Sequence, residues 1–401
     1  MLTVMSITPC SPPARPRSLA LVGLLAAHSL IGCVPSPAYD LAPGVHIDEV
    51  AAYQAVERPL VVDGEEQVSD VPLIQQRTTL LRVFVSTDDA FDGGPVLALF
   101  TVGGETFEVA LDSLPPASER ADLDSTVNLE VPAHLVGPTM DWSVELLQED
   151  APGDNLDARY PAQGVASTLI DGRANVLSVV VVPFSYEADG SSRLPDLSPD
   201  RLEEFRARVM SVYPVSEVRI ELHEPVPISL ALDPGVISWG GMTLRVATLR
   251  DAEAPLDDVY YYGVVLPAET REEYCGDAQF CINGIGPVNR DGPGGLGTPE
   301  GRVAAGVGFP DRIFETAIHE LGHSHGRDHA PCTGGANDPP DPDLDYPRDD
   351  GLIESWGWDS STGELKEPGV SSDLMGYCPD RHISAYNWKA LHVRSAVNRD
   401  L

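Results

Sequence analysis

The chain has 401 residues, which is long enough for two domains, each with a hydrophobic core of its own. It carries 62 acidic against 26 basic residues, a formal net charge of −36 at pH 7. Binding of nucleic-acid phosphates requires a basic surface, so this composition argues against a nucleic-acid partner. Acidity of this degree favours solubility and does not specify a partner.

The first 33 residues have the pattern of a bacterial lipoprotein signal peptide. Arg15 and Arg17 precede an apolar run at 19–31, which is too short to span a bilayer comfortably and is typical of a signal-peptide core. The run ends in L-I-G-C, which resembles the lipobox, so we expect lipidation of Cys33 and a Pro-rich linker at 34–43. A plain secretory signal is the alternative. We therefore expect an exported protein, either secreted or held at the outer membrane or cell surface by its lipid alone.

Residues 44–172 have a strand-like pattern and are expected to form an accessory domain. Short apolar or alternating runs at 80–86, 96–100, 107–111 and 142–146 are separated by clusters of Gly, Pro and Asp. This spacing predicts a β-sandwich of immunoglobulin-like type. No group of titratable residues stands out in it, so we expect a spacer or a substrate-binding module.

Residues 173–401 alternate between strand and helix patterns, which predicts a twisted sheet with helices packed against it. The fold class expected for the whole chain is therefore α+β. The predicted strands are at 174–183, 216–222, 259–266 and 302–309, and the predicted helices are at 198–212, 241–251, 311–325 and 383–397. A glycine-rich stretch at 275–300 contains no G-K-[ST], so it is not a phosphate loop.

The segment 318–329 reads I-H-E-L-G-H-S-H-G-R-D-H and carries the motif H-E-x-x-H-x-x-G-x-x-H. On a helix, His319 and His323 are four residues apart and share one face, so both can bind one metal ion. Gly326 can adopt a positive φ that ends the helix and lets His329 return as a third ligand. Glu320 lies beside the ligands without having to bind the metal. Three imidazoles leave a fourth position open, the arrangement of a catalytic zinc site.

The residues around this motif agree with a helix. Asp311 follows Pro310 and is the expected N-cap. A stripe of apolar residues at three- and four-residue spacing is expected to bury the back of the helix, leaving the histidines on the other side. The members of this stripe are Ile313, Phe314, Ala317, Ile318 and Leu321.

About fifty residues further on, the sequence S-D-L-M-G-Y-C at 372–378 resembles the Met-turn of the metzincin clan of zinc proteases. The resemblance covers about residues 175–401. It implies that Met375 lies beneath the metal without binding it. The spacing to Tyr377 is similar to that in astacins and serralysins, and implies that this tyrosine ligates zinc or stabilises an oxyanion. It also implies an edge strand within 282–288 that pairs with an extended substrate.

This resemblance implies a zinc-dependent endopeptidase. Zinc held by three neutral imidazoles would activate a water for attack on a peptide carbonyl, with Glu320 as general base and Tyr377 assisting. We expect a monomer that acts on a protein or glycoprotein. Two alternatives stay open: a catalytically silent zinc-containing surface protein, and a hydrolase of another amide or of a glycoprotein linkage.

Four cysteines remain once Cys10 is removed with the signal and Cys33 is lipidated, and they allow three pairings. We favour Cys275–Cys281, which closes a short loop, and Cys332–Cys378, which would brace the residues after His329 against the Met-turn. The acidic loop at 337–351 is a second place to consider a metal, because clustered carboxylates can bind calcium. Its spacing does not match an EF-hand, so a solvated loop is the preferred interpretation and Ca²⁺ the alternative.

Overall fold

The structure is a computed structural model that describes residues 38–278, 281–290, 297–332, 339 and 341–397. The expected signal peptide and its Cys33 lie outside these residues. From Ala38 onward the chain forms one compact unit. Among the helices of the described part, none is both long and apolar enough to cross a membrane.

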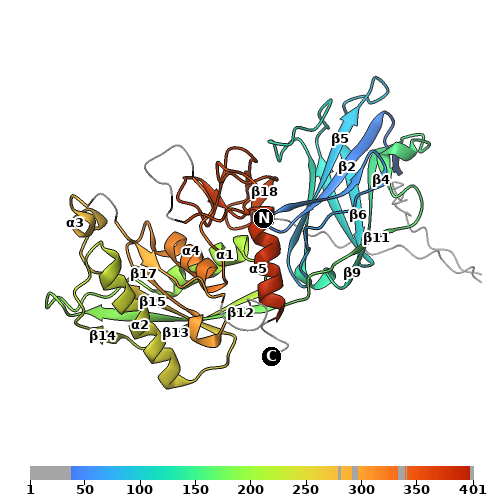
Figure 1. Cartoon of the computed structure of the whole chain (residues 1–401). Coiled ribbons are helices and arrows are strands. Elements are labelled where there is room, and N and C mark those ends of the chain that lie inside the picture. The colour runs from blue at the N-terminus through green and yellow to red at the C-terminus, as the bar shows by residue number, and fades with distance from the viewer. Residues whose placement is uncertain (1–37, 279–280, 291–296, 333–338, 340, 398–401) are drawn as a thin grey trace, which may run out of the picture. The chain divides into compact units, whose positions relative to one another are not determined.

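The first half contains two antiparallel sheets, seen in blue to green in Figure 1. One sheet has the strand order β1 (Tyr39–Leu41), β9 (Thr139–Glu149), β6 (Val96–Val102) and β7 (Glu105–Leu111), with β10 (Arg159–Tyr160) and β11 (Ala166–Leu169) also paired to β9. The other has the order β4 (Glu65–Glu66), β3 (Glu57–Val62), β2 (Val45–Tyr53), β5 (Thr79–Thr87) and β8 (Val127–Val131). Side chains of both sheets share one core, the sandwich arrangement that the alternating pattern predicted.

All four strands predicted in this half lie within β5, β6, β7 and β9. The expected linker differs from the structure, because residues 39–41 form β1 and pair with β9. Composition alone suggested a spacer there. The buried Leu41 and Ala42 instead join the sandwich core, which is why this segment is ordered as a strand.

The second half is built on a mainly parallel sheet with the order β13 (Glu217–Leu222), β12 (Val176–Tyr186), β15 (Val259–Val265), β17 (Val303–Val307) and β16 (Gly284–Ile285). The short β14 (Val226–Ile228) pairs with the end of β12. Only β16 runs antiparallel to its neighbour, and it lies at the edge within the predicted range 282–288. Two small two-stranded sheets follow, β18 (Gly357–Asp359) with β19 (Glu364–Lys366) and β20 (Ser372–Asp373) with β21 (Arg381–His382).

Helices cover both faces of this sheet (Figure 1). Because side chains alternate along a strand, Val179 and Val181 join one core with α1 (Pro199–Val212) and α4 (Ile313–Ser324). Val180 and Val182 join a second core with α2 (Val236–Glu253). The remaining α-helices of the described residues are α3 (Arg271–Cys275) and α5 (Ala385–Val397).

One helix boundary differs clearly from the prediction, since α2 begins at Val236 and not near Gly241. The predicted start falls at the second of two successive glycines, Gly240 and Gly241. The helix continues through them because the neighbouring Trp239 and Met242 are fully buried under the sheet. This tertiary packing outweighs the weak helix propensity of glycine, about 1 kcal/mol per residue.

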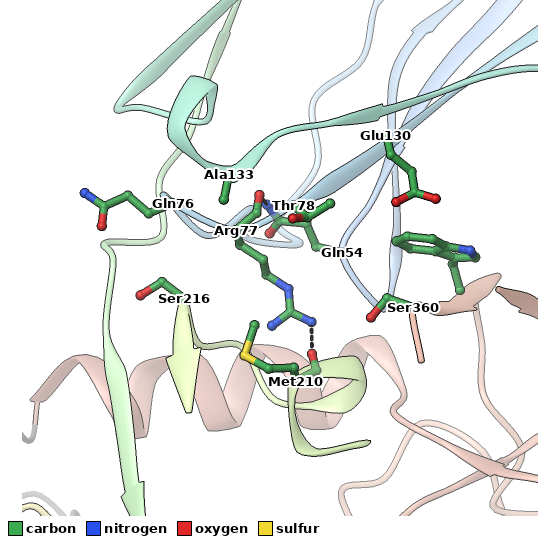
Figure 2. A pocket seen from close by; sticks show the side chains of 10 residues that line it. Gln54, Gln76, Arg77, Thr78, Glu130, Ala133, Met210, Ser216 and Ser360 are labelled. Atoms are coloured by element: carbon green, nitrogen blue, oxygen red, sulfur yellow. Dashed lines mark hydrogen bonds between the residues drawn. The ribbon is translucent and has the colours of Figure 1, made fainter. Parts of the chain in front are cut away.

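A buried arginine joins the sandwich to the second half. Arg77 is 3% exposed, and its guanidinium donates a hydrogen bond to the carbonyl of Met210 at the end of α1 (Figure 2). It also donates to the carbonyls of Tyr213 (2.7 Å) and Val215 (2.8 Å), which follow the helix. It also lies over the ring of Trp388, 5.1 Å from the centroid. A cation at this position satisfies helix-terminal carbonyls and is favoured by the helix dipole. A hollow of about 330 Å³ beside it is lined by residues of both halves.

We expect Arg77→Met to lower the free energy of unfolding by roughly 2–4 kcal/mol, because the buried carbonyls lose a charged donor. Arg173→Met, which removes an exposed guanidinium, is the matched control and should change stability by less than about 0.5 kcal/mol. Denaturant unfolding of the three proteins measures both values. Equal stability of the Arg77 variant and its parent would show that these contacts do not stabilise the junction.

Candidate metal centre

Helix α4 carries the motif and is anchored by its apolar face. Ile313, Phe314, Ala317 and Leu321 are all buried in the core shared with α1, as the spacing predicted, while Ile318 is half-buried. The predicted N-cap at Asp311 is wrong. The N–H groups of Arg312 and Ile313 both donate to the carbonyl of Phe309, so a turn precedes the helix and Arg312 takes the cap position.

The helix ends where the motif requires. Gly326 has φ of 81°, its N–H donates to the carbonyl of His323, and the N–H of Arg327 donates to the carbonyl of Gly322. This hydrogen-bond pair is the Schellman motif, in which glycine takes the left-handed position without strain. The reversal brings His329 back beside the two helical histidines, as expected from the sequence.

Three imidazoles converge here. The Nε2 atom of His323 lies 3.2 Å from that of His319 and 3.1 Å from that of His329, and the three candidate ligand atoms lie within 4.8 Å of one another. Nitrogen atoms bound at 2.0–2.1 Å around a tetrahedral metal such as zinc are separated by about 3.3 Å. The cluster could therefore bind a metal ion. It is the one such group of three among the residues described.

The hydrogen bonds of the two helical histidines decide which nitrogen faces the centre. The Nδ1 atom of His319 lies 2.9 Å from the carbonyl oxygen of Leu374, and that of His323 lies 2.7 Å from the carbonyl oxygen of Arg327. A carbonyl can only accept, so each Nδ1 carries the proton and each Nε2 presents a lone pair. Lone pairs that face one another at 3.2 Å repel unless a cation lies between them, which is further support for a metal ion.

Burial keeps these rings neutral. Desolvation lowers the pKa of His323 to about 3, and the pKa of His319 is also well below its ordinary value for the same reason. A metal ion at this site would therefore not compete with protons for these two nitrogen atoms near neutral pH.

The Met-turn lies directly under the helix. Met375 is fully buried, and a Cβ atom added at Gly322 would lie 2.3 Å from its Sδ atom, so only glycine allows this approach. The turn is held by Asp373, whose carboxylate accepts from the N–H of Met375 (2.7 Å) and the N–H of Ser384 (2.9 Å). This arrangement aims the carbonyl of Leu374 at His319.

A side-chain network connects this turn to the second helical histidine. The amide of Asn387 on α5 donates to Asp373 (2.8 Å) and accepts from the Nε–H of Arg327 (2.6 Å). The carbonyl of Arg327 in turn receives the Nδ1–H of His323. Asp373 and Asn387 therefore support both histidines through backbone carbonyls. Neither was predicted; Asp373 stands two residues before Met375, a spacing typical of a side-chain turn, whereas nothing in the sequence marks Asn387.

Glu320 is buried at the side of the cluster and is 7% exposed. Desolvation raises the pKa of its carboxyl to about 8, opposed by a hydrogen bond from the N–H of Gly286. A cation bound by the histidines would lower this pKa again. The edge strand β16 and the residues after it therefore pass directly beside Glu320, which places a sheet edge next to the cluster.

Tyr377 lies beside His329 and is 42% exposed. Its hydroxyl is 2.8 Å from the Nε2 atom of His329, and burial raises its pKa to about 12. The residue after it, Cys378, forms a disulfide with Cys332, three residues after His329. This bond holds the third histidine close to the tyrosine, as expected.

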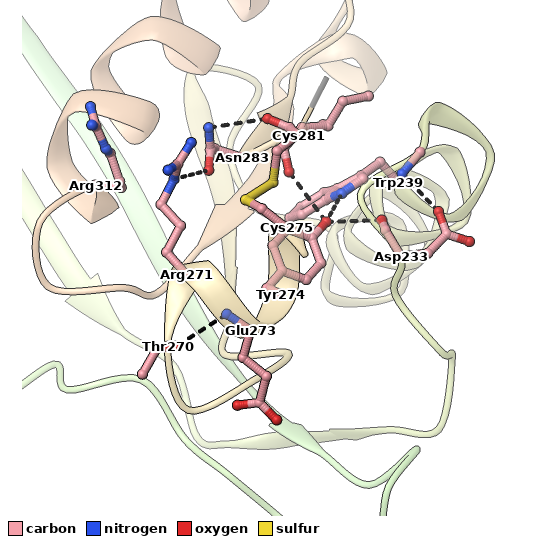
Figure 3. The surroundings of a disulfide bond; sticks show 12 residues. Asp233, Trp239, Thr270, Arg271, Glu273, Tyr274, Cys275, Cys281, Asn283 and Arg312 are labelled. Atoms are coloured by element: carbon pink, nitrogen blue, oxygen red, sulfur yellow. Dashed lines mark hydrogen bonds between the residues drawn. A yellow bond between two sulfur atoms is a disulfide. The ribbon is translucent and has the colours of Figure 1, made fainter. Parts of the chain in front are cut away.

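The second disulfide, Cys275–Cys281, is also the pairing expected from the sequence. Figure 3 shows it beside Tyr274, whose hydroxyl donates to the carbonyl of Asp233 (2.9 Å) and accepts from the ring N–H of Trp239 (2.8 Å). The disulfide thus ties the chain that enters β16 to α3, and the hydrogen bond between Tyr274 and Trp239 connects α3 to α2.

Two further features lie near the cluster. His325, to which the sequence assigns no role, is buried and stacks on Tyr260 with ring centroids 4.3 Å apart. In the acidic loop, Asp343 pairs with Arg327 and Asp350 pairs with Arg348, so these carboxylates have arginine partners. Asp338 lies outside the described residues.

No protein-family model matches the chain, and no curated protein matches it. Among solved structures it is similar to one titled "Structure of a chaperone-substrate complex", with 11% identity over 68% of this chain and a TM-score of 0.29. The chain spans 39% of the length of that structure. It is also similar to metalloproteinase-II from Bacteroides fragilis, with 12% identity over 79% of this chain and 87% of that one, again at a TM-score of 0.29. Similarities this low carry no argument about activity.

We expect Asn387→Leu to weaken zinc binding by roughly 10–100-fold, because the support of both helical histidines is interrupted at one side chain. Lys389→Met, on the same helix, removes only an exposed ion pair with Asp70 and should leave zinc binding unchanged. Competition with a chromophoric chelator measures both affinities. Parent-like affinity of the Asn387 variant would show that the network does not hold the ligands.

The buried His325 predicts a pH dependence of stability. Burial lowers its pKa from 6.5 to about 3, so below pH 6.5 the unfolded chain binds a proton that the folded chain does not. The stability it contributes is present above pH 6.5 and is lost as the pH falls towards 3.

His325→Phe keeps the stack on Tyr260 but cannot be protonated. We expect the variant, without metal, to gain about 1.4 kcal/mol over the parent for each pH unit below 6.5 in denaturant unfolding; a constant difference would contradict this.

Proposed function

We propose that the protein is an exported zinc-dependent endopeptidase of the metzincin type. The observation that carries the proposal is the convergence of three imidazole Nε2 atoms beside a buried glutamate and a partly exposed tyrosine. Three nitrogen ligands with one open position are typical of catalytic zinc, whereas structural zinc sites have four protein ligands. The hydrogen bonds from Nδ1 to backbone carbonyls are the support that metal-binding histidines require.

When bound, zinc supplies a Lewis acid that polarises a substrate carbonyl and lowers the pKa of water. His319, His323 and His329 would hold it. Glu320 acts as the general base: its buried carboxylate takes a proton from the attacking water and passes it to the leaving amine. The N–H of Gly286 holds this carboxylate in place.

Tyr377 stabilises the negative charge that develops on the carbonyl oxygen of the substrate. Its pKa of about 12 keeps the hydroxyl protonated and able to donate a hydrogen bond. Its side chain is exposed enough to contact a substrate and lies within hydrogen-bonding distance of a proposed ligand, His329.

The substrate is an extended segment of a protein or glycoprotein. The edge strand β16 runs antiparallel to β17 and presents its other side without a strand partner among the described residues. A peptide that adds to this edge would lie next to Glu320 and be bound mainly through its backbone. The two disulfides are consistent with activity outside the cytosol.

The test compares the parent protein from Pro35 onward with Glu320→Gln, which keeps the size of the side chain but cannot accept the proton. Both are incubated with a mixed protein and glycoprotein library, and new termini are read by mass spectrometry. We expect the parent to cut and the variant to lose at least about 100-fold in rate, with zinc still bound to both. Equal cutting by both would exclude Glu320 as the base.

A zinc-loaded parent that makes no cuts would favour a silent zinc protein or a hydrolase of another amide. The intact Glu320 argues against a silent protein, because a buried carboxylate without a proton-transfer role is costly to keep.

A further inference from the structure

The turn between β2 and β3 of the sandwich touches the segment that leads into the Met-turn. Ala55 accepts a hydrogen bond from the N–H of Trp358 (2.8 Å), and the N–H of Glu57 donates to the carbonyl of Trp356 (2.9 Å). Val56 and Gly357 also form an isolated antiparallel bridge. The turn is therefore paired with β18 in the manner of a short sheet.

A histidine extends this contact towards the metal centre. His382 is 1% exposed, and its Nε2–H donates to the same carbonyl of Ala55 at 3.0 Å. Its own carbonyl accepts from the N–H of Leu374 at 2.6 Å, and the carbonyl of Leu374 accepts from Nδ1 of His319 at 2.9 Å. Three hydrogen bonds thus connect a turn of the sandwich to one of the three clustered imidazoles.

The backbone at Ala55 is strained. Its φ is 106°, a region that residues with a Cβ atom rarely adopt, and the residue is fully buried. Such a conformation persists only where the surroundings hold it in place, and it is typical of sites whose geometry has a function. Here the strained turn directs its carbonyl at two donors, Trp358 and His382, so both lone pairs of the oxygen are used.

We infer that the β2–β3 turn and His382 are positioning elements of the metal centre, and that the sandwich is therefore a structural part of that centre, not a detachable spacer. This inference rests on the metal site of the proposed function. The backbone of Leu374 is held on one side by the carbonyl of His382, which accepts from the Leu374 N–H, and on the other by the carboxylate of Asp373, which accepts from the N–H of Met375. Loss of the bond between the His382 ring and the Ala55 carbonyl frees the backbone of His382 to move, and with it the backbone of Leu374 and the ring of His319.

Three variants of the full exported chain test this. His382→Leu fills the space without a donor, whereas His382→Gln keeps an N–H that can reach the Ala55 carbonyl. Gly357→Ala leaves His382 unchanged, but its new Cβ atom would lie 2.5 Å from Cδ2 of that ring and push it away. His392→Leu replaces a half-buried histidine of α5 outside the pathway and is the matched control.

The measurements are zinc affinity by chelator competition, the visible absorption spectrum of the cobalt-substituted protein, and thermal unfolding without metal. We expect His382→Leu and Gly357→Ala to lose at least about 10-fold in zinc affinity and to change the cobalt spectrum. His382→Gln should stay within about threefold of the parent, and His392→Leu should match it. If His382→Leu does not fold, the zinc affinity and cobalt spectrum of Gly357→Ala alone test the inference.

A parent-like cobalt spectrum and zinc affinity in Gly357→Ala and in folded His382→Leu would overturn the inference, even if both unfold at lower temperature. A parent that binds neither metal would overturn the metal centre and this inference together. A parent that binds zinc but cuts nothing would contradict only the proposed protease activity.

Discussion

The site depends on two hydrogen bonds from histidine Nδ1 atoms to backbone carbonyls. The carbonyls of Leu374 and Arg327 accept these bonds, and because they cannot donate, they force the Nε2 lone pairs of His319 and His323 to face each other. An unsupported imidazole would rotate to avoid this repulsion. The position of each carbonyl therefore determines whether the cluster can hold a metal, and much of the surrounding structure serves to fix those two peptide units.

Each carbonyl is held by groups far from the motif. Asp373 and Asn387 fix the turn that carries Leu374, and Asn387 also binds the side chain of Arg327. The glycine reversal at Gly326 fixes the backbone of Arg327 from the other direction. Because Asp373 is completely buried, its charge is tolerable only through these N–H donors. Removal of one hydrogen-bonding group would leave its buried partners unsatisfied. The members of this network therefore stabilise one another, and the positions of the two histidines depend on all of them.

The sequence predicted most of the elements around the motif, but it did not predict the contacts that support the cluster from distant segments of the chain. Helix α4, the turn at Gly326 and the Cys275–Cys281 disulfide follow from spacing within short segments, and the structure agrees on each. The Cys332–Cys378 disulfide, favoured among three pairings, and the edge strand, expected from the resemblance to metzincins, are also present. The start of α2 was missed because burial of Trp239 outweighs two glycines. The contact between Ala55 and His382 spans 327 residues, and neither residue carries a local pattern that would reveal it. The position of a supporting side chain depends on the fold, which a single motif does not contain.

In the absence of a metal ion, this arrangement of side chains destabilises the folded state. Two converging lone pairs, the two desolvated imidazoles of His319 and His323 and a buried carboxylate at Glu320 all raise the free energy of the folded state without an ion. The core packing of α4 and contacts such as those of Arg77 have to offset that cost. A metal ion bound by the three histidines would relieve this cost, so affinity for the ion and stability of the fold would be linked, and each could be measured through the other. The arrangement of the three histidines without a metal ion therefore depends on the packing of the rest of the fold.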